Sequence, residues 1–226
     1  MRELLEKLLP HVMRHPEALG QALVDTLIMT AWSGSIAFVL GLVLGVIITV
    51  TKRGGILENR PLFQVLDRLI NLCRSIPFII LLTGVMPLTR LIMGTAIGVR
   101  GAIVPLVFGT VPFFARQVES ALAELDPGLI EAALSMGLTP AGIIFRVYLK
   151  ESVAAIARVT TITAISLVGL TAMAGVVGAG GLGNYAIMYG HDRNQLDVTW
   201  VTIFVLVIMV SLIQLAGSRI VKRHTH

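Results

Sequence analysis

The sequence has little charge and almost no cysteine. Of its 226 residues only 14% are charged, whereas soluble domains usually contain about 25%. The single cysteine, Cys73, excludes an internal disulfide and a cysteine metal cluster. Blocks of Lys and Arg with interleaved aromatic residues are also missing. The net charge of +5 therefore does not indicate a nucleic-acid partner.

Patterns that support catalysis are missing too. The sequence contains no G-x-x-x-x-G-K-[ST] loop, so the chain cannot hydrolyse ATP unaided. No His-x3-His or Glu-x2-His spacing falls within a hydrophobic run. An intramembrane enzyme would have to use His11, His15 or the pair His191-Asp192. The pair lies in a loop, where solvation explains it better, so we expect no catalytic residue and no metal site.

Long hydrophobic runs are abundant instead. The chain is 55% hydrophobic, and its runs approach the ~20 residues that a helix needs to cross a bilayer. The sequence predicts an all-α integral membrane protein with five transmembrane helices, at roughly 26–50, 66–86, 96–115, 156–177 and 198–216. In the first span, Gly41 and Gly45 either allow close helix packing or are ordinary membrane-helix glycines.

The first residues differ from the rest of the chain. Leu4, Leu5, Leu8 and Leu9 recur at helical spacing, and acidic residues interrupt any signal-peptide core. We expect an N-terminal interfacial segment at 1–22, with an amphipathic helix that ends near Pro10. The transmembrane domain then covers 23–226.

Prolines and hydroxyl residues mark the spans. We expect Pro77, Pro105 and Pro112 to kink or interrupt their helices, and interrupted segments often lie at a transport path. The span at 156–177 holds Ser166, Thr171 and Met173. Most hydroxyls there should bond back to the preceding helical turn, and core packing is the commoner role of a methionine. The alternative hypothesis is that these three residues line a cavity, with Met173 as its gate.

Residues 126–140 predict two short helices joined at a glycine. Asp126 and Thr139 are good N-caps, and each is followed by a proline, at Pro127 and Pro140. Gly137 suits the left-handed residue that ends a helix. This structured segment lies in a loop at about 117–150, between hydrophobic spans.

A second glycine-rich stretch follows the fourth span. Residues 178–183 satisfy the spelling G-x-G-x-x-G. A dinucleotide site needs that motif after a strand and before a helix, and here it follows a membrane span. We therefore expect a tight turn outside the bilayer.

The distribution of basic residues predicts an orientation. Five spans place the two termini on opposite sides, and cytoplasmic loops carry excess Lys and Arg. With the C-terminus inside and the N-terminus outside, the inner segments hold Lys52, Arg53, Arg60, Arg116, Arg146, Lys150, Arg158, Arg219, Lys222 and Arg223. The outer segments then hold Arg2, Lys7, Arg14, Arg90, Arg100 and Arg193. The loop at 117–150 falls on the inner side.

Several of these stretches resemble one protein family. Glu131-Ala132-Ala133, three residues and then Gly137 are similar to the EAA loop of the membrane subunits of bacterial ABC importers. Lys150 stands where the family pattern has a proline, so the second helix can run on toward the next span. Three further stretches, Arg74 to Phe78, Ala102 to Leu106 and Gly178 to Gly183, look like the permease subunit of methionine importers.

The resemblance implies a machine with several subunits. It implies a type I importer in which two copies of the chain form the pore of a bacterial inner membrane. Two cytoplasmic ATPase subunits would bind ATP, so the chain itself needs no cofactor, and an extracytoplasmic protein would deliver methionine. The loop would couple to the ATPase through Leu129, Ile130, Glu131, Ala132, Ala133, Met136 and Gly137. Another small amino acid, or a passive channel, remains an alternative.

Overall fold

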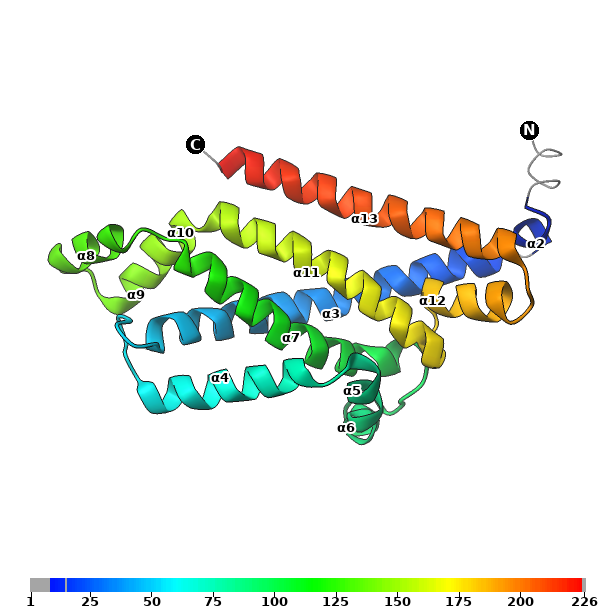
Figure 1. Ribbon diagram of the computed structural model, residues 1–226, viewed down its shortest axis with the longest axis horizontal. Helices are drawn as coiled ribbons and strands as arrows, with labels where there is room; N and C mark the ends of the chain where they lie inside the picture. The colour runs from blue at the N-terminus through cyan, green and yellow to red at the C-terminus, as the bar shows by residue number, and fades with distance from the viewer. Residues whose placement is uncertain (1–8, 15, 225–226) are drawn as a thin grey trace. The chain divides into compact units, whose positions relative to one another are not determined.

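The computed structural model describes residues 9–14 and 16–224. Every regular element within these residues is helical (Figure 1). The amphipathic helix predicted from Leu4, Leu5 and Leu8 lies outside the described residues. Near Pro10, where that helix was predicted to end, the structure has a short helix, α2, which begins at Pro10 and ends at Arg14.

The helices follow one another with short connections. Among them, η1 and η3 are π-helical turns, which are wider than an α-helix, whereas η2 contains a kink at Val177 and Gly178. In chain order the elements are α2 (Pro10–Arg14), α3 (Pro16–Thr51), α4 (Arg60–Ser75), α5 (Phe78–Gly84), α6 (Met86–Met93), α7 (Gly98–Ala123), α8 (Pro127–Ser135), α9 (Pro140–Ile143), η1 (Ile144–Tyr148), α10 (Leu149–Glu151), α11 (Val153–Ala174), η2 (Gly175–Ala179), α12 (Gly181–Tyr185), η3 (Ala186–His191) and α13 (Leu196–His224).

Four segments are long and apolar enough to cross a membrane. They are Pro16–Thr51, Gly98–Ala123, Val153–Ala179 and Leu196–His224, and they confirm four of the predicted spans as helices. The predicted span at 66–86 is not one helix. Ile76 takes an extended conformation before Pro77, with ψ of 122°, so α4 ends and α5 starts after Pro77. A residue before proline is pushed out of the α region, which explains a break instead of a kink.

The predicted interruption of the third span is wrong. Helix α7 continues from Gly98 to Ala123 through both Pro105 and Pro112. The two prolines are seven residues apart and share one face of the helix, so the backbone bonds that they remove are lost from one side only. The other side keeps its ladder, and the helix persists. Bending at these prolines remains a prediction.

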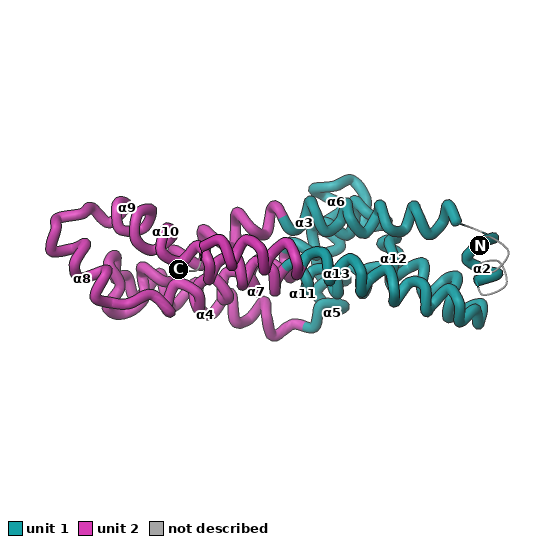
Figure 2. Tube along the Cα trace, turned by 90° about the horizontal axis from the view of Figure 1, so that it is seen from above, with its two compact units in different colours: residues 1–34, 77–107, 164–213 teal, residues 35–76, 108–163, 214–226 magenta. Residues whose placement is uncertain are grey.

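The chain divides into two compact units, which Figure 2 shows in different colours. Unit 1 comprises residues 1–34, 77–107 and 164–213, and unit 2 comprises 35–76, 108–163 and 214–226. Helix α3 runs through residues 22 and 23 without a break. The predicted boundary between an N-terminal segment and the rest therefore falls inside a continuous helix.

Within unit 2, two glycines bring α3 close to α7. A Cβ atom on Gly41 would lie 2.7 Å from the ring of Phe114, and one on Gly45 would lie 2.6 Å from Cβ of Val118. No side chain fits at such distances, so close packing is the role of these glycines. Phe114 and Val118 belong to a buried cluster with Val50, Ala133, Ile143 and Tyr148.

Within unit 1, the glycine-rich stretch packs on α3. Gly178, Gly180 and Gly181 have positive φ angles of 90°, 85° and 77°, which glycine adopts without strain. The N–H of Leu182 donates to the hydroxyl of Thr26, at 2.8 Å between nitrogen and oxygen. The predicted turn is confirmed. It follows helical segments and not a strand, so it differs from a dinucleotide-binding motif. Its place outside the bilayer remains a prediction.

Candidate functional site

The loop between α7 and α11 has the predicted helix–glycine–helix form (Figure 1). The carboxylate of Asp126 accepts from the N–H of Gly128 at 2.9 Å, and the hydroxyl of Thr139 accepts from the N–H of Gly142 at 3.2 Å. Pro127 and Pro140 occupy the first helical positions. Both caps and both prolines thus act as the sequence predicts, since each works through its immediate neighbours.

Gly137 closes the first helix in a left-handed conformation. Its φ is 74°. The N–H of Leu138 donates to the carbonyl of Ala133 at 3.1 Å, and the N–H of Gly137 donates to the carbonyl of Leu134 at 2.9 Å. This pair of bonds is a Schellman motif, which satisfies carbonyls that a helix end otherwise leaves free. The turn between α8 and α9 is therefore held by the backbone itself.

The predicted coupling residues divide into two sets. Leu129, Glu131, Ala132, Met136 and Gly137 are exposed, and Met136 is 72% exposed. Ala133 is only 2% exposed and lies in the buried cluster of unit 2, and Ile130 packs against the same cluster. Ala133 therefore offers no exposed contact surface within this chain, because its face of α8 holds the helix to the protein. Its part in coupling remains a prediction.

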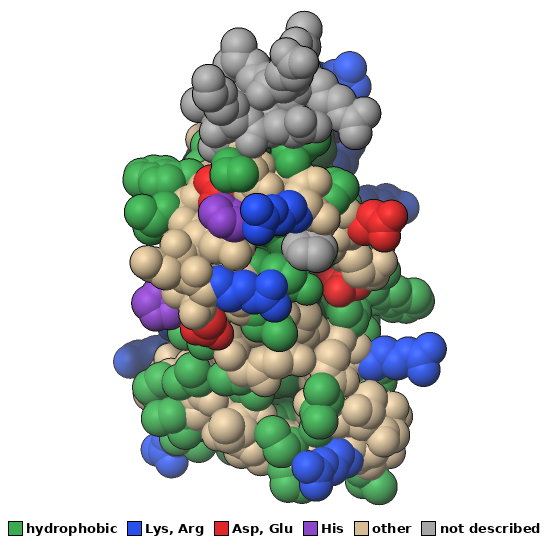
Figure 3. Space-filling model, turned by 90° about the vertical axis from the view of Figure 1, so that its right-hand side faces the viewer, with side chains coloured by type: hydrophobic (Ala, Val, Ile, Leu, Met, Phe, Trp, Pro, Cys, Tyr) green, Lys and Arg blue, Asp and Glu red, His purple; other side chains and the backbone are tan. Residues whose placement is uncertain are grey.

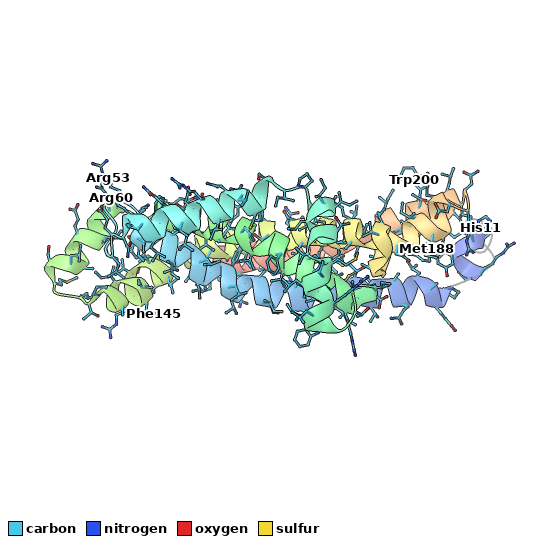
Figure 4. All side chains as sticks on the ribbon, turned by 90° about the horizontal axis from the view of Figure 1, so that it is seen from below. His11, Arg53, Arg60, Phe145, Met188 and Trp200 are labelled. Atoms are coloured by element: carbon cyan, nitrogen blue, oxygen red, sulfur yellow. The ribbon has the colours of Figure 1, made fainter. Side chains whose placement is uncertain are left out.

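Two exposed apolar residues next to this surface were not predicted. Phe145 in η1 is 69% exposed, and Leu134 in α8 is also exposed. Figure 4 shows Phe145 on the outer side of the loop. The sequence does contain a signal for the exposure of Phe145, because Ile143 and Val147 are four residues apart and share a face. Phe145 lies between them in sequence and so must point elsewhere.

A pocket opens on this loop. It has a volume of about 550 Å³ and is lined by Gly137, Leu138, Thr139, Ala141, Gly142, Phe145 and Arg146. Its wall combines the glycine turn, the start of α9 and an aromatic ring. Tyr148, which follows Arg146 in the same helical turn, lies in the buried cluster of unit 2, and burial raises the pKa of its phenol. The loop thus presents apolar side chains and a hollow over a rigid base.

The second helix of the loop runs on toward α11. Helices α9, η1 and α10 follow one another directly from Pro140 to Glu151, and only Ser152 leaves the helical pattern before Val153. The expectation drawn from Lys150 is confirmed, since that position carries no proline to end the helix. An almost continuous helix therefore joins the loop to α11.

The residues predicted to line a path do not share one environment. Ser166 and Met173 are both exposed on α11, and Met173 is 42% exposed, which rules out core packing within this chain. Thr171 is 1% exposed, and its hydroxyl donates to the carbonyl of Val168 at 2.7 Å. The prediction that Thr171 faces a cavity is therefore corrected. Thr160, Thr161 and Thr163 also bond back to the preceding turn, as expected.

Histidines and acids form no metal site in residues 9–14 and 16–224. Within unit 1, the Nδ1 atom of His11 lies 3.0 Å from a carboxylate oxygen of Asp197, which ties α2 to the start of α13. Figure 3 shows histidine, acidic and basic side chains beside hydrophobic ones on the surface that it views. His191 and Asp192 are exposed, in agreement with a solvated pair.

Known proteins resemble this chain along most of its length. Residues 37–225 match the family model described as "Binding-protein-dependent transport system inner membrane component". A probable D-methionine transport system permease protein MetI from Vibrio cholerae is 48% identical over 202 residues, which are 89% of this chain and 90% of the relative. The corresponding protein of Pasteurella multocida is 45% identical over 93% of this chain and 97% of its own.

Solved structures agree with these relatives. A chain of an inward-facing MetNI methionine ABC transporter superposes with a TM-score of 0.92 at 46% identity, covering 94% of this chain and 99% of that one. A chain of an amino acid ABC transporter crystallised with histidines has a TM-score of 0.78 at 18% identity and shares the fold. This chain belongs to the family of inner membrane components of binding-protein-dependent transport systems, and within it to the MetI-type permeases.

Proposed function

We propose that the chain is the permease subunit of an ATP-driven importer that carries methionine, in either enantiomer or as close derivatives, across the bacterial inner membrane. Two relatives at 48% and 45% identity are named as D-methionine permeases and align along about nine-tenths of the chain. The single observation that carries the proposal is the capped helix–glycine–helix loop with its exposed apolar surface. Such a rigid apolar surface suits a partner protein.

We propose the partner proteins of this chain from the same comparisons. The family name specifies a binding protein, and the MetNI structure is that of a methionine ABC transporter. The chain would therefore act as a homodimer with two cytoplasmic ATPase subunits and an extracytoplasmic methionine-binding protein. Leu129, Glu131, Ala132, Met136 and Gly137 would contact the ATPase, joined by Leu134 and Phe145. Ala133 and Ile130 would hold the loop in place from below.

The mechanism we propose is alternating access. ATP binding would close the ATPase dimer and bring the two loops together. Because the loop continues into α11 almost without interruption, its displacement would reach the membrane segments. The cavity would open outward, and hydrolysis would reverse the change. A ligand shifts such an equilibrium only by its differential affinity for the two states.

We propose that Ser166 and Met173 face the translocation path. Both are exposed on α11, and Gly169 between them has no atom near its missing side chain. This narrow face of small residues ends at the flexible thioether of Met173. A methionine can close a gate and later move aside without breaking hydrogen bonds.

Orientation is part of the proposal. The five-span arrangement requires the segment with α4 and α5 to cross the bilayer despite its break at Ile76-Pro77. The N-terminus would then lie outside and the C-terminus inside, with Lys222 and Arg223 on the cytoplasmic side. The loop with α8 and α9 would face the cytoplasm, where the ATPase is.

Reconstitution tests the proposed function. The chain would be co-expressed with its ATPase, purified, placed in liposomes with internal ATP and supplied with the binding protein. We expect uptake of labelled methionine that needs ATP and is competed by unlabelled methionine. Competition only by another small amino acid would assign a different substrate. Uptake that continues without ATP would show a passive channel and would contradict the proposal.

A further inference from the structure

Helix α4 differs from the other long helices in composition. With 16 residues, it is not among the helices that are long and apolar enough to cross a membrane. Its sequence nevertheless alternates apolar and polar residues with helical spacing. At 100° per residue, three separate faces can be distinguished. The proposed function does not yet use any of them.

The first face packs inside unit 2. Ile70 is buried with Ile48 of α3 and Ala115 of α7, and Phe63 and Leu66 pack on the same cluster. This contact fixes the rotation of α4 about its axis. The sides of α4 that do not carry these residues are therefore the ones that stay exposed.

The second face is apolar and exposed. Leu62, Val65, Leu69 and Leu72 all point away from the rest of the chain. They recur at intervals of three and four residues, as one stripe of a helix does. In a membrane protein an exposed aliphatic stripe of this kind suits lipid.

The third face is polar and exposed, and we call it the α4 polar stripe. It consists of Gln64, Arg68, Asn71 and Ser75, which are all exposed and fall within an arc of about 60° on a helical wheel. Lipid is a poor cover for such a face, because an arginine within a bilayer must snorkel, pair or meet water.

The charges near the stripe leave Arg68 without a partner. Asp67, the adjacent acid, is engaged by Arg116 at 2.7 Å, and Arg116 also reaches Glu119 at 2.6 Å and the Asn71 oxygen at 3.0 Å. Among the described residues no carboxylate pairs with Arg68. The Asn71 amide also donates to Asp67, and the Ser75 hydroxyl donates to the carbonyl of Leu72. The group that the stripe offers is therefore the uncompensated guanidinium of Arg68.

We propose that the α4 polar stripe lines the aqueous translocation path and that Arg68 attracts the carboxylate of the amino-acid substrate. This inference rests on the proposed function, since a methionine zwitterion supplies the carboxylate. An arginine holds a carboxylate through two parallel N–H bonds. A lysine keeps the charge but loses that geometry.

Cysteine accessibility tests where the stripe lies. In the full complex with the Cys73→Ser background, Gln64→Cys, Asn71→Cys and Ser75→Cys sample the stripe, and Leu62→Cys, Val65→Cys and Leu69→Cys sample the apolar face. The probe is a cationic, membrane-impermeant methanethiosulfonate. We expect stripe positions to react about tenfold faster, because only a thiol in contact with water ionises.

Two outcomes would overturn the placement. Equal reactivity of both faces would put α4 at the membrane surface or in solvent. Unreactive stripe positions that form disulfides between two copies would make the stripe a dimer seam. The labelling needs no transport, so it reports on α4 even if the wild-type complex fails to import methionine. Failure to import methionine would contradict the proposed function but not the placement of the α4 polar stripe.

Substitution tests the role of Arg68. We expect Arg68→Gln to raise the KM for methionine uptake at least about tenfold, since the charge and the paired N–H bonds to the carboxylate are lost, with a smaller change in kcat. Arg68→Lys should recover part of the affinity. Arg74→Gln is the matched control, since Arg74 is exposed on the same helix but lies off the stripe. An unchanged KM in Arg68→Gln, or an equal rise in Arg74→Gln, would refute the carboxylate contact.

Discussion

Single atoms decide the packing of α3. Gly41 and Gly45 meet Phe114 and Val118 at distances that leave no room for a methyl group, whereas Gly20 in the same helix has no atom within 4 Å of the corresponding position. Chemically identical residues in one helix thus have different roles. The difference lies in what packs on them, so it can be tested with one substitution at two places.

We predict that Gly45→Ala destabilises the chain and that Gly20→Ala does not. The new methyl group at Gly45 would force α3 and α7 apart, at about 1–3 kcal/mol for overpacking. At Gly20 the same change should raise helix stability slightly. Thermal unfolding of the detergent-solubilised complex measures both. Equal melting temperatures for the two variants would contradict this account of the α3–α7 contact.

A second prediction at this scale concerns Met173. Because its side chain is exposed in the chain, truncation should not cost the roughly 2–5 kcal/mol of a core methionine. We expect Met173→Ala to assemble normally and to raise ATP turnover without substrate, since the closed gate loses its plug. Melting temperature and basal ATPase rate in one preparation provide the check. A lower melting temperature with unchanged ATPase would show that Met173 is buried against a partner.

At the scale of elements, short-range signals were the most informative. Asp126, Thr139 and Gly137 act on backbone groups a few residues away, so the helix–glycine–helix form was predictable from sequence alone. Burial was not predictable in this way. Ala133 and Thr171 look like their exposed neighbours in sequence, and only the packing of distant segments places them inside.

The prolines show the same difference between local sequence signals and the effect of tertiary packing. Pro77 acts on Ile76, its neighbour, and the helix breaks there. Pro105 and Pro112 lie in a helix that packs along much of its length, and the helix continues through both. Local preference is overridden where tertiary contacts stabilise the helix. The predicted interruption was therefore wrong at Pro105 and Pro112, whereas Pro77, which was expected to kink its span, breaks it.

We predict that Gly137→Val uncouples the importer. Its φ of 74° costs a non-glycine residue roughly 1–2 kcal/mol, and a β-branched side chain is the least tolerant. Gly137→Asn is the matched control, because asparagine visits this region more readily. ATP-driven uptake should fall in the order Gly, Asn, Val while chain expression stays similar. Full uptake with valine would remove the glycine turn from the coupling role.

At the scale of the whole molecule, orientation determines which surface meets which partner. The loop with α8 and α9 serves an ATPase only if it faces the cytoplasm. We predict that Thr225→Cys, in the Cys73→Ser background, is not labelled by an impermeant thiol reagent in intact cells and that Glu3→Cys is. Labelling after permeabilisation is the control. The reverse pattern would place the loop outside and would refute the proposed coupling.

The Schellman turn at Gly137 separates two properties that most contact surfaces combine. The shape of the loop depends on backbone bonds, two caps, two prolines and one glycine. The contact surface that we propose for the loop consists of other residues, chiefly the exposed Leu129, Leu134, Met136 and Phe145. Exchanging those four side chains should therefore leave the loop folded while changing which ATPase it recognises. The permease could in this way be paired with a different ATPase, and matched changes on both proteins would give transporters that assemble independently in one cell.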